Sequence, residues 1–232
     1  RAYRNLVIRT AATLRMDDET NMHLALRIYD LIQFEGLSYA RIYTDLIKKL
    51  RTADRADFQF RATKAAIRYL HKVMVIKDEV FVAHLLTSVE KKKRDFQRYR
   101  IDPARGDRAV YRHINRPEFT VFGIHIRFHM VTRDWQLRVM KRMKFLRKLL
   151  PGWHVREKAF RDWYLGLLKE FRYHDLASYE AYVRALEVPE EVRGYREVRY
   201  PKMEEAKQKA EAFLKGPGPS GKTSETKVHF TS

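Results

Sequence analysis

The sequence predicts a mainly α-helical protein, an irregular domain of about seven helices with one short β-hairpin inserted near residues 110–130. Over most of the chain, apolar residues recur at spacings of three and four, which is the period of an amphipathic helix. One stretch alternates instead, as a strand does. The composition, 45% hydrophobic with only nine glycines and seven prolines in 232 residues, fits a packed domain rather than a low-complexity chain.

The first two predicted helices form an antiparallel pair. Residues 17–36 begin with Asp17 or Asp18 as the cap of the first turn and end at Gly36. Residues 37–50 carry a continuous apolar stripe and follow after this single glycine, so we expect the two helices to be antiparallel neighbours.

Two further helices are predicted before the hairpin. Residues 57–76 have an apolar side, and residues 78–86 continue as a separate helix capped by Asp78. His71 and His84 lie among apolar residues of these helices, which favours core histidines over ligands or general bases.

A basic connection leads from these helices to the hairpin. The segment EKKKRDFQRYR is polar and mostly basic, and it reaches a turn at Arg105-Gly106-Asp107.

The stretch HINRPEFTVFGIHIRFHM, residues 113–130, supplies the hairpin. Its alternation predicts an apolar face of Ile124, Ile126, Phe128 and Met130, and a polar face of His125, Arg127 and His129. Residues four apart in a strand are separated by about 13 Å, so His125 and His129 do not share a metal ion. We therefore expect no metal site here.

The C-terminal part is predicted to be helical again. Thr132 caps a helix over 133–150 that Pro151-Gly152 ends, and further helices cover 153–171, 178–186 with Ser178 as cap, and 200–215. Residues 1–215 then form one helical domain, and the Gly, Pro and Ser content of residues 216–232 predicts a flexible linker or tail.

Charge is the strongest compositional signal. The formal net charge is +19, from 48 Lys and Arg against 29 Asp and Glu, and such a field attracts nucleic acid, phosphate-bearing ligands or acidic proteins. The chain has no cysteine, which excludes disulfides and thiolate metal or cluster sites within it. With no apolar run long enough to cross a bilayer, we expect part of a longer cytoplasmic protein.

The common catalytic signatures are missing from the sequence. It has no G-x-G-x-x-G, no G-x-x-x-x-G-K-[ST], no H-E-x-x-H and no G-x-S-x-G motif. The acidic run Asp17-Asp18-Glu19 and the pair Asp78-Glu79 open helices, where the dipole favours acids, so we interpret them as caps. No catalytic residue and no metal ligand is predicted.

The helix predicted over 133–150 is the strongest local candidate for a binding surface. The helix carries seven basic residues, one of which is Arg147. The other six are candidates for binding an anion or an acidic partner: Arg133, Arg138, Lys141, Arg142, Lys144 and Lys148. A nucleic-acid ridge would use them on phosphates, with Trp135 and Phe145 as stacking groups. Alternatively, they are surface side chains whose stems cover apolar neighbours. Because apolar residues spread around much of this helix, we favour contact with a protein partner, with nucleic acid as the alternative.

Several segments together resemble the C-terminal helical region of indolepyruvate ferredoxin oxidoreductase-like proteins, within the thiamine-dependent 2-oxoacid:acceptor oxidoreductases. They are HLALRIYDLIQFEGLSYARIY, VMVIKDEVFVAHLL, HINRPEFTVFGIHIRF, TRDWQLRVMKRMKFLR, LPGWHVREKAFRDWY and PEEVRGYREVRYPKM, and the similarity covers residues 1–205. The match is one of overall pattern, and none of these segments is a catalytic signature.

The resemblance implies a parent enzyme that uses thiamine diphosphate, Mg²⁺, 4Fe-4S clusters and coenzyme A, and that passes electrons to ferredoxin. This chain lacks cysteines for clusters, and Gly106-Asp107 lacks the rest of the thiamine–Mg²⁺ pattern. We therefore expect an accessory domain that packs against other domains or subunits, or that attracts acidic ferredoxin or coenzyme A. The alternative is a basic helical nucleic-acid-binding or protein-interaction domain with no enzymatic link.

Overall fold

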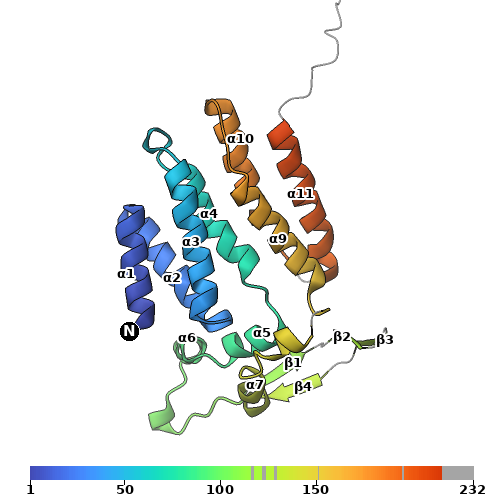
Figure 1. The fold of residues 1–232 in the computed structure, drawn as a ribbon. Coiled ribbons are helices and arrows are strands. Elements are labelled where there is room, and N and C mark those ends of the chain that lie inside the picture. The colour runs from blue at the N-terminus through green and yellow to red at the C-terminus, as the bar shows by residue number, and fades with distance from the viewer. Residues whose placement is uncertain (116–117, 122–123, 128–129, 151, 195, 216–232) are drawn as a thin grey trace, which may run out of the picture.

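The computed structural model confirms a mainly α-helical fold (Figure 1). It describes residues 1–115, 118–121, 124–127, 130–150, 152–194 and 196–215. These residues contain eleven α-helices rather than about seven, together with four short strands. The helices are α1 (Ala2–Leu14), α2 (Asp18–Phe34), α3 (Leu37–Ala53), α4 (Arg61–Met74), α5 (Glu79–Leu86), α6 (Val89–Tyr99), α7 (Asp134–Met140), α8 (Leu146–Leu149), α9 (Val155–Lys169), α10 (Leu176–Glu187) and α11 (Arg199–Lys215).

The elements form two groups (Figure 1). The helical bundle consists of α1–α4 and α9–α11, with α4 at its centre in contact with α2, α3, α9 and α10. The small lobe consists of α5–α8 and the strands, and lies across one end of the bundle. The bundle is therefore built from helices that precede the β structure and helices that follow it.

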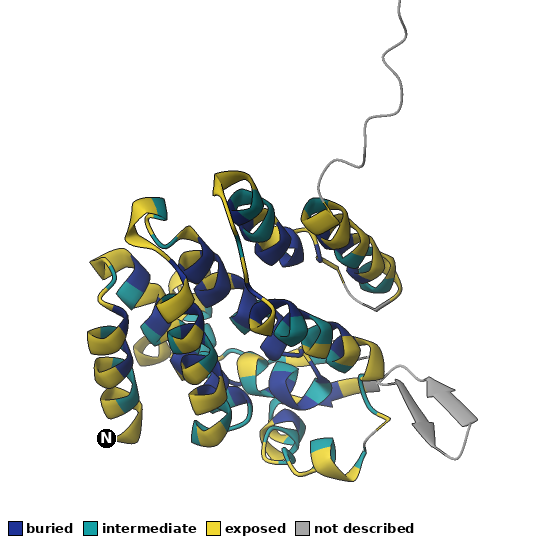
Figure 2. Ribbon diagram, turned by 45° about the horizontal axis from the view of Figure 1, so that its top comes forward, coloured by how far each residue is buried: buried dark blue, intermediate teal, exposed yellow. Residues whose placement is uncertain are grey.

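The core lies inside the bundle, where the inward faces of the helices are buried (Figure 2). Ala62, Ala65 and Ala66 on α4 are small, which lets neighbouring helices approach closely. Tyr43 and Tyr164 are fully buried, and each hydroxyl donates to a backbone carbonyl across the core, at 2.7 Å in both cases. Their polar ends are thus satisfied, as burial requires.

A buried polar network ties α3, α4 and α10 together. Asp54, which follows α3, accepts from the backbone N–H of Thr63 at 2.8 Å and from its hydroxyl at 2.7 Å. The Tyr179 hydroxyl donates to Asp54 Oδ1 at 2.9 Å and accepts from the backbone N–H of Ala62 at 3.1 Å. Asp54 and Tyr179 thereby satisfy two free N–H groups at the start of α4, as a cap does.

Most of the predicted helix ends are confirmed. Asp17 accepts from the N–H of Thr20 and caps α2, and Asp78 accepts from the N–H of Phe81 and caps α5. Gly36 separates α2 from α3 at φ 113°, a left-handed conformation that favours glycine. Ser178 was wrong as a cap, because Asp175 caps α10 and Ser178 is its capping-box partner.

The N-terminal leader and the basic connection are also helices. Residues 2–14 form α1, which packs on α2 and α3. The basic connection forms α6, none of whose residues is buried. The predicted Arg105-Gly106-Asp107 turn is present, with Gly106 at φ 87°.

The predicted β structure is confirmed in place and type. The strands β1 (Arg112–Asn115) and β4 (Met130–Arg133) pair antiparallel, as do β2 (Glu118–Val121) and β3 (Ile124–Arg127). We predicted that His125 and His129 lie on the polar face of a strand and do not share a metal ion. Their side chains lie outside the part that the structure describes. Residues 216–232, the predicted linker, also lie outside it.

The described helices include none with the length and apolar character that a bilayer span requires.

Tyr179→Phe tests the buried network. The change leaves the buried Ala62 N–H without its acceptor and removes one donor from Asp54, so we expect the free energy of unfolding to fall by about 1–3 kcal/mol. The matched control is Tyr3→Phe, whose exposed hydroxyl donates to Ala25 and should cost less than about 1 kcal/mol. Urea denaturation measures both, and equal losses would contradict the role given to the network.

Candidate functional site

The segment predicted as one helix over 133–150 is broken in two, and that prediction was wrong. Helix α7 ends at Met140, and the chain passes through turns with i→i+3 hydrogen bonds, such as Met143 N–H to Met140 O, before α8 starts at Leu146. Thr132 is not the cap of α7: it is buried in β4, and Arg133 holds the cap position. The break lets Leu137 bury in the small lobe while the following turns reach the bundle.

Helix α8 is held in place by polar contacts. It has four residues, and none of them is buried. Arg147 on this helix donates from Nε to Asp78 Oδ2 at 2.5 Å and from Nη2 to Asp78 Oδ1 at 2.9 Å. Its Nη1 donates to Glu35 Oε2 at 2.7 Å and also to the carbonyl of Phe34, whose ring lies under the guanidinium at 4.0 Å.

These contacts join α8 to two helix ends. Asp78 caps α5 with the same carboxylate that binds Arg147. Lys144 donates to the carbonyl of Gln33 at 2.5 Å, so two cations meet the last carbonyls of α2, where the helix dipole favours positive charge. Burial alone would lower the pKa of Arg147, but Asp78 and Glu35 outweigh it and raise that pKa. Burial, with Arg147 nearby, lowers the pKa of Lys144.

A histidine forms a second bridge between the lobe and the bundle. His154, which precedes α9, lies 3.3 Å from Glu79 of α5 and 3.3 Å from Glu157 of α9. Burial disfavours its charged form, but the hydrogen bonds to Glu157 and Glu79 prevail and raise the pKa of His154 to about 9. The imidazole is therefore charged at neutral pH and neutralises two partly buried carboxylates.

The basic residues of 133–150 fall into three groups. Lys144, one of the predicted binding residues, and Arg147 are partly buried and bind groups of the protein itself, so we call them internal anchors. Arg138 is on the surface but pairs with Asp134 at 2.6 Å. The remaining candidates, Arg133, Lys141, Arg142 and Lys148, have no ion pair among the described side chains, and of these only Lys141 is partly buried.

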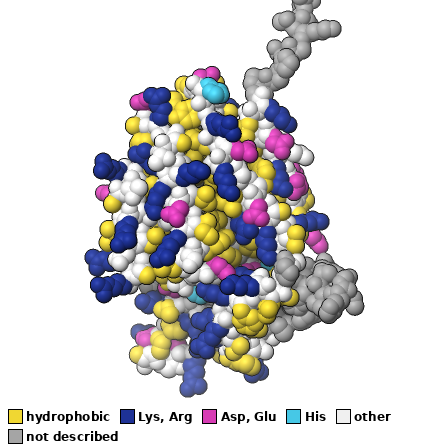
Figure 3. Space-filling view, in the orientation of Figure 1, with side chains coloured by type: hydrophobic (Ala, Val, Ile, Leu, Met, Phe, Trp, Pro, Cys, Tyr) yellow, Lys and Arg dark blue, Asp and Glu magenta, His cyan; other side chains and the backbone are white. Residues whose placement is uncertain are grey.

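Apolar side chains share this surface. The exposed fractions are 62% for Trp135, 55% for Val139, 54% for Phe145 and 67% for Leu149. In Figure 3, hydrophobic and basic side chains lie side by side on the small lobe. We call the exposed residues of 133–149, together with the partly buried Lys141, the docking surface: Arg133, Trp135, Arg138, Val139, Lys141, Arg142, Phe145, Lys148 and Leu149.

The structure adds residues that the sequence analysis missed. A groove of about 460 Å³ runs between α6, residues 109–112 and the start of α7, and it is lined by Lys92, Tyr111 and Arg112 as well as Arg133 and Trp135. Strand pairing brings Arg112 opposite Arg133. The sequence analysis missed this pairing because the alternation of polar and apolar residues does not determine the register of the strands.

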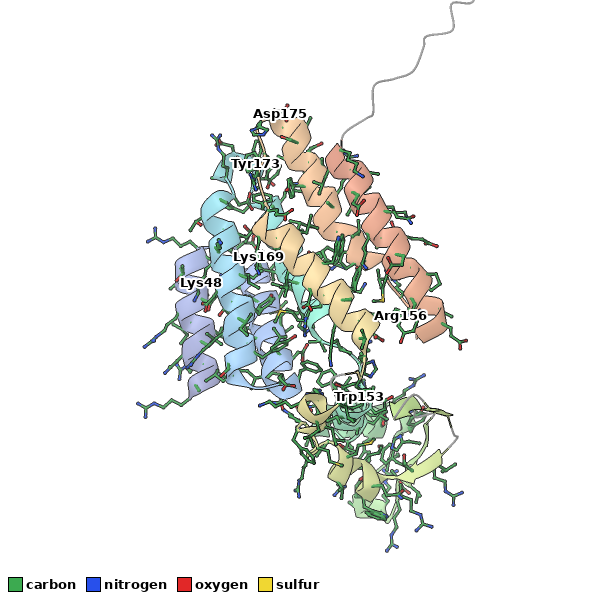
Figure 4. All side chains as sticks on the ribbon, turned by 45° about the vertical axis from the view of Figure 1, so that its right-hand side comes forward. Lys48, Trp153, Arg156, Lys169, Tyr173 and Asp175 are labelled. Atoms are coloured by element: carbon green, nitrogen blue, oxygen red, sulfur yellow. The ribbon has the colours of Figure 1, made fainter. Side chains whose placement is uncertain are left out.

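A smaller cavity of about 260 Å³ lies at the junction of bundle and lobe, lined by Phe34, Tyr39, Trp153, Lys148 and Arg161 among others. Figure 4 shows Trp153 at this junction. The Arg147 network forms part of its wall, so the cavity belongs to the joint between the two groups of elements.

Within the described side chains, no group of three or more histidines and acids is placed to hold a metal ion. The carboxylates nearest the docking surface, those of Asp78, Asp134 and Glu35, are each bound by a cation. These carboxylates therefore serve as ion-pair partners that hold neighbouring elements together.

The fold and this surface define the class: a mainly helical domain that presents basic and apolar side chains together. The chain belongs to a family of unknown function, DUF6537, whose family model matches residues 20–212. No curated protein and no solved structure matches the chain.

Arg147→Met tests the anchor of α8. It leaves the buried Asp78 carboxylate without its cation, so we expect the free energy of unfolding to fall by about 3–5 kcal/mol. Lys148→Met, the adjacent residue on the exposed side, should change it by about 0.5 kcal/mol or less. Denaturant titration of both variants gives the comparison, and a loss below about 1 kcal/mol for Arg147→Met would contradict the anchor.

His154→Gln tests the second bridge through its pH dependence. Because the folded pKa of about 9 lies above the ordinary 6.5, the stabilisation from charged His154 is complete below about pH 6.5 and is lost as pH rises through about 9. The variant should be less stable than wild type by up to about 3 kcal/mol at pH 6, and the difference should shrink toward pH 10. Unfolding curves across this range measure it, with the exposed His23→Gln as control. A difference that stays constant with pH would contradict the charged bridge.

Proposed function

We propose that this chain is a non-catalytic accessory domain of a thiamine-dependent 2-oxoacid:ferredoxin oxidoreductase of the indolepyruvate type, and that its docking surface attracts an acidic protein partner, ferredoxin, in the cytoplasm. The observation that carries the binding role is a set of four cations that form no ion pair with the side chains that the structure describes. They are Arg133, Lys141, Arg142 and Lys148, and they are interleaved with exposed Trp135, Phe145 and Leu149. The resemblance of residues 1–205 to the helical region of that enzyme family supports the assignment to an oxidoreductase.

The work of this domain is association rather than chemistry. Exposed cations speed the encounter with an acidic protein and set its orientation, and apolar side chains at the centre of a contact supply most of the affinity. Thiamine diphosphate, Mg²⁺, 4Fe-4S clusters and the coenzyme A site belong, on this proposal, to other domains or subunits. The internal anchors Lys144 and Arg147 fix the orientation of the surface.

Nucleic acid is the alternative partner, because exposed Trp135 beside cations also suits base stacking over a phosphate backbone. The exposed aliphatic residues Val139 and Leu149 favour a protein, since they offer neither stacking nor charge to a nucleic acid.

The test replaces Lys141, Arg142 and Lys148 with glutamine in the oxidoreductase that carries this domain. We expect the apparent KM for ferredoxin to rise by about threefold or more and its dependence on salt to flatten, because long-range attraction is reduced. The value of kcat at saturating ferredoxin should stay within about twofold, since no transition-state contact is removed. Steady-state kinetics at two salt concentrations measure all three quantities.

The matched control removes the same charge from exposed positions of the bundle outside the small lobe, by replacing Lys49, Lys169 and Arg172 with glutamine (Figure 4 labels Lys169). Its KM should change by less than the docking-surface variant's. Submicromolar binding of duplex DNA at physiological salt, with unchanged turnover in the docking-surface variant, would replace this proposal by the nucleic-acid alternative.

A further inference from the structure

The groove beside the docking surface brings together residues that are distant in sequence. It lies between α6, residues 109–112 and the first turn of α7, and has a volume of about 460 Å³. Its lining residues are Lys92, Phe96, Ala109, Val110, Tyr111, Arg112, Arg133, Asp134, Trp135 and Arg138. Four of these are cations and one is an acid.

Two of the arginines face each other across a ladder. Arg112 of β1 and Arg133 of β4 are direct partners in the antiparallel pairing. Side chains of directly opposed residues lie on the same face, and like charges there destabilise the pair by up to about 1 kcal/mol. Neither guanidinium has an acidic partner among the side chains that the structure describes, so the repulsion is not compensated within that part of the molecule.

The groove's own acid is already engaged. Asp134 Oδ2 binds Lys92 at 3.1 Å and Arg138 at 2.6 Å. These two cations outweigh burial and lower the pKa of Asp134. Both cations thus hold the same oxygen of this carboxylate, and the arginine pair is left to bind an anion from outside the chain.

Apolar surface stands next to the arginine pair. Val110 is 82% exposed and Trp135 is 62% exposed, and both line the groove. A ligand that satisfies the whole groove needs one or two carboxylates for the guanidiniums and an apolar side chain for Trp135 and Val110. Arginine binds carboxylates through paired N–H donors, which gives the contact direction as well as strength.

We propose that this groove binds an acidic peptide segment of the docked partner, with its carboxylates between Arg112 and Arg133 and an apolar side chain against Trp135. This inference rests on the proposed docking function and names the chemistry of its contact. A single-stranded nucleic acid would also bring anions and a ring to Trp135. The exposed aliphatic wall at Val110 favours the peptide, because an apolar side chain packs against it and a phosphate backbone does not.

The experiment uses the 232-residue chain and a fluorescent hexapeptide, Asp-Glu-Leu-Phe-Glu-Asp, as the probe. We expect saturable binding by fluorescence anisotropy, weakened at least about tenfold in the double variant Arg112→Gln/Arg133→Gln and in Trp135→Ala. The control Lys49→Gln/Arg172→Gln removes the same charge outside the groove and should weaken binding by less than about twofold. Replacing leucine and phenylalanine of the peptide with serine should weaken its binding to the wild-type chain.

Thermal unfolding provides a second readout that does not depend on the peptide. Because Arg112→Gln/Arg133→Gln relieves like-charge repulsion, the double variant should be as stable as wild type or more so, which separates lost binding from lost folding. The saturating peptide should raise the Tm of wild type and leave that of the double variant unchanged.

Three results would overturn the inference: no saturable binding of the peptide by wild type, equal weakening in the control variant, or a single-stranded oligonucleotide that binds more tightly than the peptide through the same residues. Failure here leaves the KM test of the docking surface standing, because that test changes Lys141, Arg142 and Lys148, none of which lines the groove. Conversely, peptide binding by a chain whose docking-surface variant keeps a normal KM would separate the groove from the oxidoreductase.

Discussion

The orientation of the small lobe depends on one cation that is largely shielded from solvent. Arg147 is only 10% exposed and binds Asp78, which is 3% exposed, together with Glu35 and the end of α2. Removing such charges from water is costly, and only nearly complete hydrogen bonding offsets the cost. Here both oxygens of Asp78 meet the guanidinium fork. Since α8 buries no residue of its own, this joint, with Lys144 and His154 beside it, sets where the neighbouring exposed side chains point.

The joint also explains why only some of the positively charged side chains are available to a binding partner. Some cations are internal partners of acids or carbonyls, as Arg147, Lys144 and His154 are, and others pair on the surface, as Arg138 does. The cations left without an ion pair in the described part are those that a partner's charge can reach. The net charge of +19 therefore determines the long-range field. Binding at the docking surface depends on those of its charges that have no ion pair in the described part of the chain.

The sequence predicted what local chemistry decides and missed what distant contacts decide. The caps Asp17 and Asp78 and the glycine junction at Gly36 were predictable, because each acts within a few residues. The break after Met140 was not, since basic and apolar residues over 133–150 suit a helix and the competing contacts come from Glu35 and Asp78, far away in the chain. Contacts of the same long-range kind make Lys144 an internal anchor, whereas Arg133, Arg142 and Lys148 are exposed.

The pair Arg112 and Arg133 extends this reasoning to function. Neither residue is unusual in sequence, and a one-residue change of register would place them on different pairs. The observed register opposes them beside exposed Trp135, while the nearest acid, Asp134, is already held by Lys92 and Arg138. Neither arginine has an acidic partner in the described part of the chain, so this pair of like charges at the surface is available to an external anion. Where a structure keeps like charges together without an internal partner, an external ligand of opposite charge gains the most from binding, because it relieves repulsion as well as forming new contacts.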